Sequence, residues 1–388
     1  MSGLARAEPV SGTLARVMIC DDSVTIRGAI ARMLETDPGI RVVAKVSNGR
    51  MAVEELKRTK VDVVVLDIEM PVLDGMAALP LLLQTDPGLR VIMASTLTTR
   101  GADIAMRALR LGAADYVPKP SSIGSQSDDR FRQEIISKVK GLARLRQRAA
   151  APARPAAPIV TRPAPVLPPK LLAIGSSTGG PQALFTLIQA LGRSVNVPVI
   201  LTQHMPATFT PILAEHITRL GGLPCAEAKD GEPLLPGRIY LAPGDKHLII
   251  EPGGAARAGD GDGPRGGQAG GQASGYRAPM GGVMARARLS NDPPENFCRP
   301  AVDPMLRSAA GVCDGQVLVA MLTGMGHDGL AGTRRVVEAG GAAVAQDEAT
   351  SVVWGMPGAI AQAGLCHAVL PLPRIAPKLL EMLRVAAR

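Results

Sequence analysis

The sequence predicts an α/β protein of two domains, each built on a parallel sheet. Three observations support this prediction. Short runs rich in β-branched residues alternate with helical patterns in both halves of the chain. A segment made almost entirely of alanine, proline and small apolar residues separates the two halves. The length of 388 residues also exceeds what one ordinary hydrophobic core organises.

The first domain is expected over residues 15–140, as five strands that are each followed by a helix. Helical periodicity fills the gaps between strands, for example over Ile26–Leu34 and over Ala102–Leu111, which Gly112 follows as a C-cap would. Five such units predict a flavodoxin-like, doubly wound parallel sheet with helices on both faces. The predicted strands are Val17–Cys20, Arg41–Val46, Val61–Leu66, Val91–Ala94 and Asp115–Val117.

A linker is expected over residues 149–169, because proline lacks a backbone donor and favours extended geometry. The second domain is expected over residues 170–388, again doubly wound and mostly parallel, with a flexible Gly-rich surface loop at 253–275. Its predicted strands are Leu171–Ile174, Val197–Thr202, Arg238–Leu241, Val317–Leu322 and Ala342–Ala345.

Composition argues against several classes of protein. No apolar run approaches the roughly 20 residues that cross a bilayer, and the N-terminus lacks the apolar core of a signal peptide. The five cysteines form no CxxC pair, so neither a disulfide framework nor a zinc site is expected, and a reducing cytoplasm fits best. The net charge of +9 is spread over both halves rather than gathered in one patch, so no nucleic-acid partner is expected. The chain is expected to be a monomer.

Acidic residues gather at the predicted strand ends of the first domain. Asp21 and Asp22 follow the first strand and Asp67 follows the third. In a parallel sheet these ends meet at one edge, where ligands bind. Three converging carboxylates repel one another unless a cation joins them, and hard oxygen ligands suit Mg²⁺. With the metal present, Asp67 could attack a phosphoryl donor, while Ser95 and Lys119 could hold the new phosphoryl oxygens.

The second domain opens with a strand that runs into the turn Gly-Ser-Ser-Thr-Gly-Gly-Pro at residues 175–181. Ser177 stands at the centre of a G-x-S-x-G pattern, where a serine is exposed near helix N–H groups that stabilise an oxyanion. Taken alone, this turn equally predicts a dinucleotide or phosphate site. Two further strand ends favour catalysis, because His204 follows the second strand and Asp328 follows Val317–Leu322. A serine, a histidine and an aspartate at one sheet edge have the geometry of a triad.

Two other residues remain rivals for these roles. His327 lies beside Asp328 and is an alternative base, and Ser176 is a nominal second nucleophile, although the register into the helix favours Ser177. His216, His247 and His367 lie in or beside regular elements, for which a structural role is expected.

Residues 15–140 resemble the receiver domain of two-component response regulators. The matching stretches are IC-DDS, VVVLDIEMPVLDG and DYVPKP. The resemblance implies that Asp67 is the phosphoacceptor and that a histidine kinase supplies the phosphoryl group.

Residues 170–373 resemble the chemotaxis protein-glutamate methylesterase/glutaminase family. The matching stretches are AIGSSTGGP, QHMP, YLAPGDKHL, RPAVD, LTGMGHDG and VVWGMP. The resemblance implies that Ser177 is the nucleophile, His204 the base and Asp328 its orienter. It also implies hydrolysis of glutamyl methyl esters on cytoplasmic chemoreceptor helices, deamidation of certain glutamines there, and no cofactor for hydrolysis. An unphosphorylated receiver would cover the active site until phosphorylation of Asp67 uncovers it.

The chain departs from that family pattern at two places. Ser176 replaces the alanine more usual in the turn, and Phe297 and Cys298 stand where the family commonly shows a Gly-His pair. The second departure concerns the substrate groove rather than the triad.

Three other functions would require different sequence features. A DNA-binding regulator would need a compact helix-turn-helix with concentrated basic charge, which residues 170–388 lack. An NAD-dependent oxidoreductase would need an acidic residue at the end of its second strand, where Thr202, Gln203 and His204 stand. The residues alone do not exclude a third function, that of an adaptor whose esterase domain is inactive.

Overall fold

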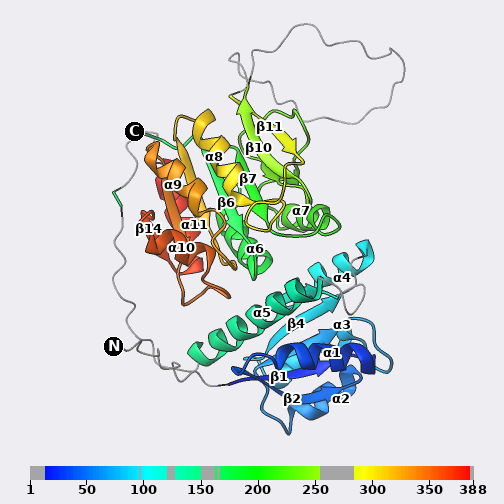
Figure 1. Cartoon of the computed structure of the whole chain (residues 1–388). Coiled ribbons are helices and arrows are strands. Elements are labelled where there is room, and N and C mark those ends of the chain that lie inside the picture. The colour runs from blue at the N-terminus through cyan, green and yellow to red at the C-terminus, as the bar shows by residue number, and fades with distance from the viewer. Residues whose placement is uncertain are drawn as a thin grey trace, which may run out of the picture.

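Two α/β domains lie side by side in the computed structural model, and helix α5 (Ser127–Ala149) runs between them (Figure 1). The structure describes residues 14–95, 98–119, 127–149, 162–163, 167–253 and 284–384. Among these residues, no helix combines the length and apolarity needed to cross a membrane.

The N-terminal domain has a five-stranded sheet of order β2-β1-β3-β4-β5, in which every neighbouring pair is parallel. Helices α1 and α5 pack against one face, and α2, α3 and α4 pack against the other. Both faces are therefore buried, which explains the continuous apolar runs of the central strands. Besides α5, its elements are β1 (Ala15–Cys20), α1 (Val24–Leu34), β2 (Ile40–Val46), α2 (Gly49–Leu56), β3 (Val63–Asp67), α3 (Gly75–Thr85), β4 (Arg90–Ser95), α4 (Thr99–Arg110) and β5 (Asp115–Pro118).

The C-terminal domain has a seven-stranded parallel sheet of order β14-β13-β12-β6-β7-β9-β8 and a separate antiparallel hairpin, β10-β11. Strand β6 lies between β12 and β7, so the carboxyl ends of these three strands are adjacent. The elements are β6 (Leu171–Ser176), α6 (Gly180–Leu191), β7 (Val199–Gln203), α7 (Thr210–Arg219), β8 (Cys225–Glu227), β9 (Ile239–Leu241), β10 (His247–Pro252), β11 (Ala285–Ser290), α8 (Val302–Val312), β12 (Val317–Met321), α9 (Leu330–Glu338), β13 (Ala342–Gln346), α10 (Met356–Gln362), β14 (Ala368–Leu370) and α11 (Leu372–Arg384).

The predicted fold class is confirmed in both domains, and the structure adds four strands for which the sequence pattern gave no bounds: β8, β10, β11 and β14. Apart from Gly253, the Gly-rich loop at 253–275 lies outside the described residues, as does most of the linker at 149–169. Helix α5 continues to Ala149, past residue 140, where the first domain is expected to end. The turns of α5 beyond residue 140 pack on the N-terminal domain, because Leu142 is buried and Arg146 forms an ion pair with Asp86 at 2.7 Å.

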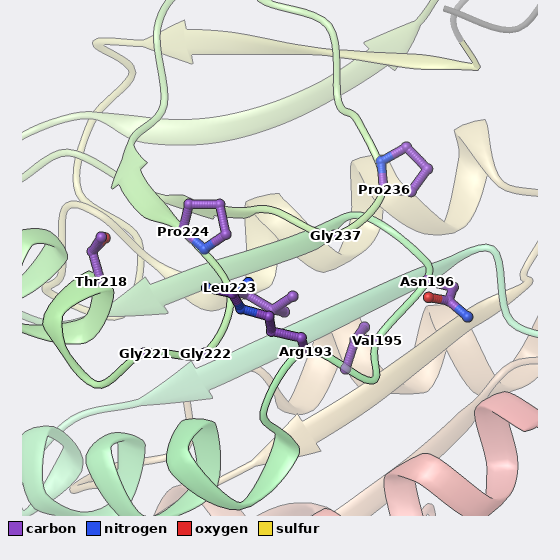
Figure 2. Close-up of a pocket in the computed structure, with 10 residues that line it drawn as sticks. All are labelled: Arg193, Val195, Asn196, Thr218, Gly221, Gly222, Leu223, Pro224, Pro236 and Gly237. Atoms are coloured by element: carbon purple, nitrogen blue, oxygen red, sulfur yellow. The ribbon is translucent and has the colours of Figure 1, made fainter. Parts of the chain in front are cut away.

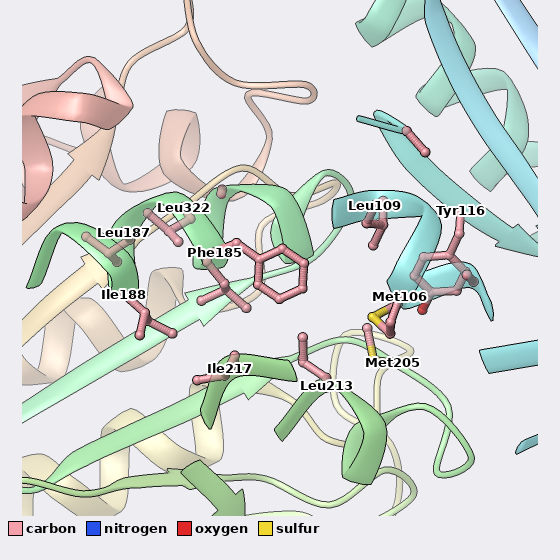
Figure 3. Close-up of a cluster of buried hydrophobic side chains, with 14 of the residues drawn as sticks. Met106, Leu109, Tyr116, Phe185, Leu187, Ile188, Met205, Leu213, Ile217 and Leu322 are labelled. Carbon is pink, nitrogen blue, oxygen red and sulfur yellow. The ribbon is translucent and has the colours of Figure 1, made fainter. Parts of the chain in front are cut away.

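The two domains share one apolar cluster (Figure 3). Met106, Leu109 and Tyr116 of the N-terminal domain belong to the same buried cluster as Met205 and Leu213 of the C-terminal domain. The Tyr116 ring stacks on the ring of Phe209, with centroids 4.7 Å apart. Such burial makes the contact between the domains an extension of their cores rather than a loose surface encounter.

Candidate active site and phosphoacceptor site

At the carboxyl edge of the N-terminal sheet, two buried carboxylates share one lysine. Asp67 is the last residue of β3, and Asp21 directly follows β1. Lys119, which follows β5, places its Nζ 2.7 Å from Asp67 Oδ1 and 2.8 Å from Asp21 Oδ2. The backbone N–H of Ile68 also donates to Asp67 Oδ1, at 2.7 Å. The parallel strands thus bring these predicted residues together at one point.

Burial raises the pKa of Asp67, an effect that Lys119 opposes and the neighbouring Asp21 carboxylate reinforces. Burial alone would lower the pKa of Lys119, but its contacts with the two carboxylates raise that pKa overall. A buried carboxylate whose charge is incompletely balanced invites a further cation.

The donor set suits a small hard cation. Carboxylate oxygens of Asp21, Asp22 and Asp67 lie within 4.8 Å of one another, and Asp22 is exposed. Oxygen ligands on a partly open edge, with room for water, fit Mg²⁺. Ser95, the last residue of β4, is 2% exposed, and its hydroxyl has no hydrogen-bond partner among the described residues. A buried unpartnered hydroxyl can donate to an anion that arrives later.

In the C-terminal domain, β6 turns sharply into α6 through glycines. Gly179 is the N-cap of α6 with φ of 76°, a conformation that favours glycine. A Cβ at Gly180 would lie 1.9 Å from Oε1 of Gln203, so the helix could not approach β7 with a larger residue there. The turn is fixed on its other side by the Ser177 N–H, which donates to Thr323 O at 3.0 Å.

The two serines of this turn have different environments. Ser176 is fully buried, and its hydroxyl donates to Oε1 of Gln203 at 2.7 Å. Ser177 is only partly buried, and no hydrogen bond of its hydroxyl is recorded within the described ranges. Of the two hydroxyls, that of Ser177 is therefore the one available to a substrate.

His204 follows β7 and contacts a buried carboxylate. Its Nε2 lies 2.7 Å from Oδ2 of Asp328, which is 2% exposed. Burial by itself would lower the pKa of His204, but hydrogen bonds with Asp328 and Cys298 raise it to about 9. Burial would likewise raise the pKa of Asp328, whereas His204 and nearby backbone N–H groups lower it overall. The pair is thus stabilised with the imidazole protonated.

The Asp328 carboxylate is anchored at the start of helix α8. Backbone N–H groups of Val302 and Asp303 donate to it at 2.6 and 3.1 Å, where the helix N-terminus favours negative charge. The amide of Asn296 donates to Asp328 at 2.9 Å and to Asp303 at 2.9 Å. Sequence reasoning missed Asn296, because an asparagine in an irregular loop carries no periodic signal.

The second ring nitrogen of His204 faces a thiol. Sγ of Cys298 lies 3.4 Å from Nδ1 of His204. Since Nε2 is engaged by Asp328, Nδ1 is the nitrogen left to accept a proton from a nucleophile. Among the described residues no hydrogen bond joins Ser177 to His204, so the structure brings the predicted base and orienter together and leaves the nucleophile unbonded beside them.

The other histidines occupy different positions. His327 is exposed, and its backbone carbonyl accepts from Leu330. His216 is fully buried in α7, with Nε2 3.5 Å from Asp103 of the N-terminal domain. His247 is 2% exposed and bonds loop backbone on both of its ring nitrogens.

The N-terminal domain contacts the turn that carries Ser177. Oδ2 of Asp115, in β5, accepts the backbone N–H of Gly179 at 3.0 Å. Nε2 of Gln182, in the first turn of α6, donates to the backbone carbonyls of Leu109 and Ala113. Docking of the first domain therefore reaches within two residues of the candidate nucleophile.

One cavity of the described residues lies away from this site (Figure 2). It measures about 730 Å³ and is lined by loop residues that precede β7, β8 and β9, such as Val195, Pro224 and Gly237. These residues are at the amino ends of the strands, whereas Ser177, His204 and Asp328 follow the carboxyl ends. This cavity is therefore not the candidate active site.

Comparison with known proteins gives two family matches. The family model described as CheB methylesterase matches residues 172–379, and the response regulator receiver domain model matches residues 17–126. The chain is 51% identical to a protein-glutamate methylesterase/protein-glutamine glutaminase of Azospirillum brasilense, over 97% of this chain and 93% of the relative. It is 49% identical to protein-glutamate methylesterase/protein-glutamine glutaminase 1 of Paramagnetospirillum magneticum, over 95% of this chain and 96% of the relative.

Proposed function

The chain belongs to the CheB methylesterase family, with a response regulator receiver domain at its N-terminus, and on this premise we propose that Ser177, His204 and Asp328 are its catalytic triad. The protein is a protein-glutamate methylesterase/protein-glutamine glutaminase of chemotaxis. The observation that best supports the triad is the 2.7 Å contact between His204 and the buried Asp328, beside a turn whose Ser177 is accessible.

The proposed reaction is acyl transfer. Oγ of Ser177 attacks the carbonyl carbon of the glutamyl side chain as its proton passes to Nδ1 of His204. The carbon–oxygen bond of the ester breaks, and the methoxy group leaves as methanol with that proton. With glutamine, ammonia leaves instead. Water then attacks the acyl-enzyme, giving up a proton to His204 and restoring Ser177 and a free glutamate.

Asp328 holds the imidazole in place during these steps and stabilises its charge when it is protonated. The N–H groups of Thr178 and Met325 are proposed donors to the developing oxyanion, because both residues lie in glycine-containing turns at this edge. Hydrolysis requires no cofactor in this mechanism.

We propose Asp67 as the phosphoacceptor, with a chemotaxis histidine kinase as the donor. A carboxylate oxygen of Asp67 attacks the phosphorus, and the histidine nitrogen of the kinase leaves. Asp21, Asp22 and Asp67 would hold Mg²⁺, which when bound supplies positive charge to the phosphoryl oxygens. Lys119 and Ser95 are placed to hold the transferred group, because Lys119 already contacts Asp67 and the Ser95 hydroxyl is unpartnered among the described residues.

The proposed substrates are methylated glutamates on cytoplasmic helices of chemoreceptors, so the site of action is the cytoplasm. Nucleic acid is not a proposed partner, and the chain is proposed to act as a monomer. In the docked arrangement the receiver contacts Gly179, and phosphorylation of Asp67 would release this contact and admit the substrate.

Methanol release from methylated receptor cytoplasmic fragments tests this function. The native chain should release methanol, and acetyl phosphate with Mg²⁺ should increase the rate. Ser177→Ala should abolish release, whereas Ser176→Ala, a matched change of the neighbouring buried hydroxyl, should retain it. Equal activity of Ser177→Ala and the native chain would contradict the assignment.

A further inference from the structure

A strained two-residue turn lies beside His204 and Asp328, which are called the catalytic pair below. Glu295 and Cys298 form an antiparallel bridge through backbone hydrogen bonds of 3.1 and 2.9 Å. The residues between them, Asn296 and Phe297, have φ of 52° and 62°. Asparagine tolerates this left-handed conformation, but a bulky phenylalanine rarely adopts it. Glycine would be the residue expected at position 297 if the turn served only to reverse the chain.

The surrounding loop holds this turn firmly. Both oxygens of the Glu295 carboxylate contact the guanidinium of Arg307, at 2.5 and 2.7 Å. His247 Nε2 donates to Pro293 O, and its Nδ1 accepts the N–H of Ala301. The bonds of His247 clamp the loop on either side of the turn. Strain of this kind persists only where the surroundings over-determine the backbone, and it gathers at functional sites.

The tip of the turn lies between two residues that contact the catalytic pair. Asn296 donates to the Asp328 carboxylate at 2.9 Å, and Cys298 Sγ lies 3.4 Å from His204 Nδ1. Phe297 stands between them in the chain. The residue that carries the aromatic ring is therefore flanked in the chain by residues that contact Asp328 and His204.

The Phe297 side chain is 90% exposed, more than any other large apolar side chain among the described residues. It stays exposed although the receiver is docked against the nearby turn at Gly179. In this arrangement no described residue covers the Phe297 ring, so the ring is available to a binding partner. An exposed aromatic residue on a rigid support is the type of residue that dominates binding energy in protein interfaces.

We propose that Phe297 is the docking residue for the substrate helix, packing against an apolar side chain that lies about one turn from the reacting glutamate. This inference rests on the proposed function. Phe297 directly precedes Cys298, whose Sγ contacts His204. On a substrate helix, residues three or four apart are neighbours on one face. A helix that presents its glutamyl ester to Ser177 would bring such a neighbour over the ring. Phe297 therefore contributes to the choice of which receptor glutamates are hydrolysed.

The test compares two substrates across a set of variants. Phe297→Ala and Phe297→Gly should lower kcat/KM for the methylated receptor fragment by about tenfold, mainly through KM, since alanine replacement of an interface anchor typically has at least this effect. The kcat/KM for a small aryl ester should fall far less, because this substrate has no helix to pack against the Phe297 ring. Phe297→Trp should retain most receptor activity. Phe297→Gly should also unfold at the same temperature as the native chain or higher, because it relieves the backbone strain.

Met284→Ala is the matched control, because Met284 is an exposed apolar residue at the end of the β10-β11 hairpin far from His247. It should leave both activities unchanged. The inference is overturned if Phe297→Ala matches Met284→Ala on the receptor fragment, or if receptor and aryl ester activities fall equally, since Phe297 would then support the catalytic pair rather than dock the helix. A native chain that hydrolyses the aryl ester but not the receptor fragment would overturn the proposed function itself, and this inference with it.

Discussion

Each sheet has a buried aspartate at or beyond the carboxyl end of a strand, and their surroundings shift the pKa values of these two carboxylates in opposite directions. Asp67 accepts one backbone N–H, contacts Lys119 and lies beside a second carboxylate, and burial raises its pKa. Asp328 has a lowered pKa, because it meets His204 and several N–H donors. These donors belong to Val302, Asp303, Gly329 and Asn296.

This difference indicates which of the two carboxylates can react as a nucleophile. The hydrogen bonds of Asp328 engage both of its oxygens, so it suits a carboxylate that orients a neighbour. Asp67 has an oxygen, Oδ2, without a hydrogen bond among the described residues, as a nucleophile needs. One architecture thus supports a reacting and an orienting carboxylate, and the number of N–H donors distinguishes them. Five predictions test this contrast and the contact between the domains, in order of decreasing expected effect.

Asp328→Asn should lower kcat for receptor demethylation by about 10⁴-fold, the scale seen when the orienting carboxylate of a triad is neutralised. The amide keeps the shape but cannot stabilise a protonated His204. Methanol release measures the effect. If the variant kept more than a tenth of native activity, Asp328 would not be the orienter.

Asp67→Asn should abolish stimulation by acetyl phosphate, because the amide is not a nucleophile. Phosphoryl incorporation and methanol release, measured in the same samples, would show whether both are lost. Asp22→Asn is the matched control: Asp22 is exposed and is proposed only as a metal ligand, so more Mg²⁺ should restore its response. Incorporation of phosphate into Asp67→Asn would place the phosphoacceptor elsewhere.

The activity of the resting enzyme should rise with pH toward an inflection near 9, because His204 must be neutral to act as a base and its pKa is about 9. Cys298→Ala should move this inflection down by about one unit, since the contact with Cys298 helps to raise the pKa. A pH–rate profile of both proteins measures the shift, and an unchanged inflection would mean that Cys298 does not act on His204.

Protonation of His204 should also stabilise the fold, because its pKa in the folded chain is above the ordinary value of 6.5. This contribution is complete below about pH 6.5 and is lost as the pH rises through about 9. Thermal unfolding of the native chain and His204→Gln over this range measures it: their difference should shrink with rising pH.

Gln182→Ala should raise unstimulated activity by about fivefold, because it removes two hydrogen bonds that hold the receiver at the α6 turn. Gln189→Ala, an exposed glutamine farther along the same helix, is the matched control. A rate for Gln182→Ala equal to that of this control would indicate that the contact does not restrain the enzyme.

Much of this arrangement could be predicted from the sequence, because Asp67, His204 and Asp328 end or follow apolar strands, and parallel strands bring such residues to the carboxyl edge of their sheet. Periodicity and parallel topology locate such residues without long-range information. The match of β12, predicted at Val317–Leu322 and found at Val317–Met321, is an example.

Loop contacts and contacts between the domains have no periodic pattern in the sequence. Asn296 lies in an irregular loop, whose contacts depend on α8 and β10 folding beside it. Contacts between the domains could not be predicted from the sequence either. Tyr116 and Phe209 resemble ordinary core residues there, and only the structure shows that their rings stack. Asp115 was predicted as part of a strand, without a role at Gly179.

The most direct test of the whole account is the rate at which a fluorophosphonate labels Ser177, followed by mass spectrometry of the full chain with and without acetyl phosphate and Mg²⁺. The account predicts that phosphorylation accelerates labelling of Ser177 in the native chain, and that Asp67→Asn shows only the slow rate. Equal labelling rates in all four samples, or a label on Ser176, would contradict the claim that the phosphorylated receiver frees this nucleophile.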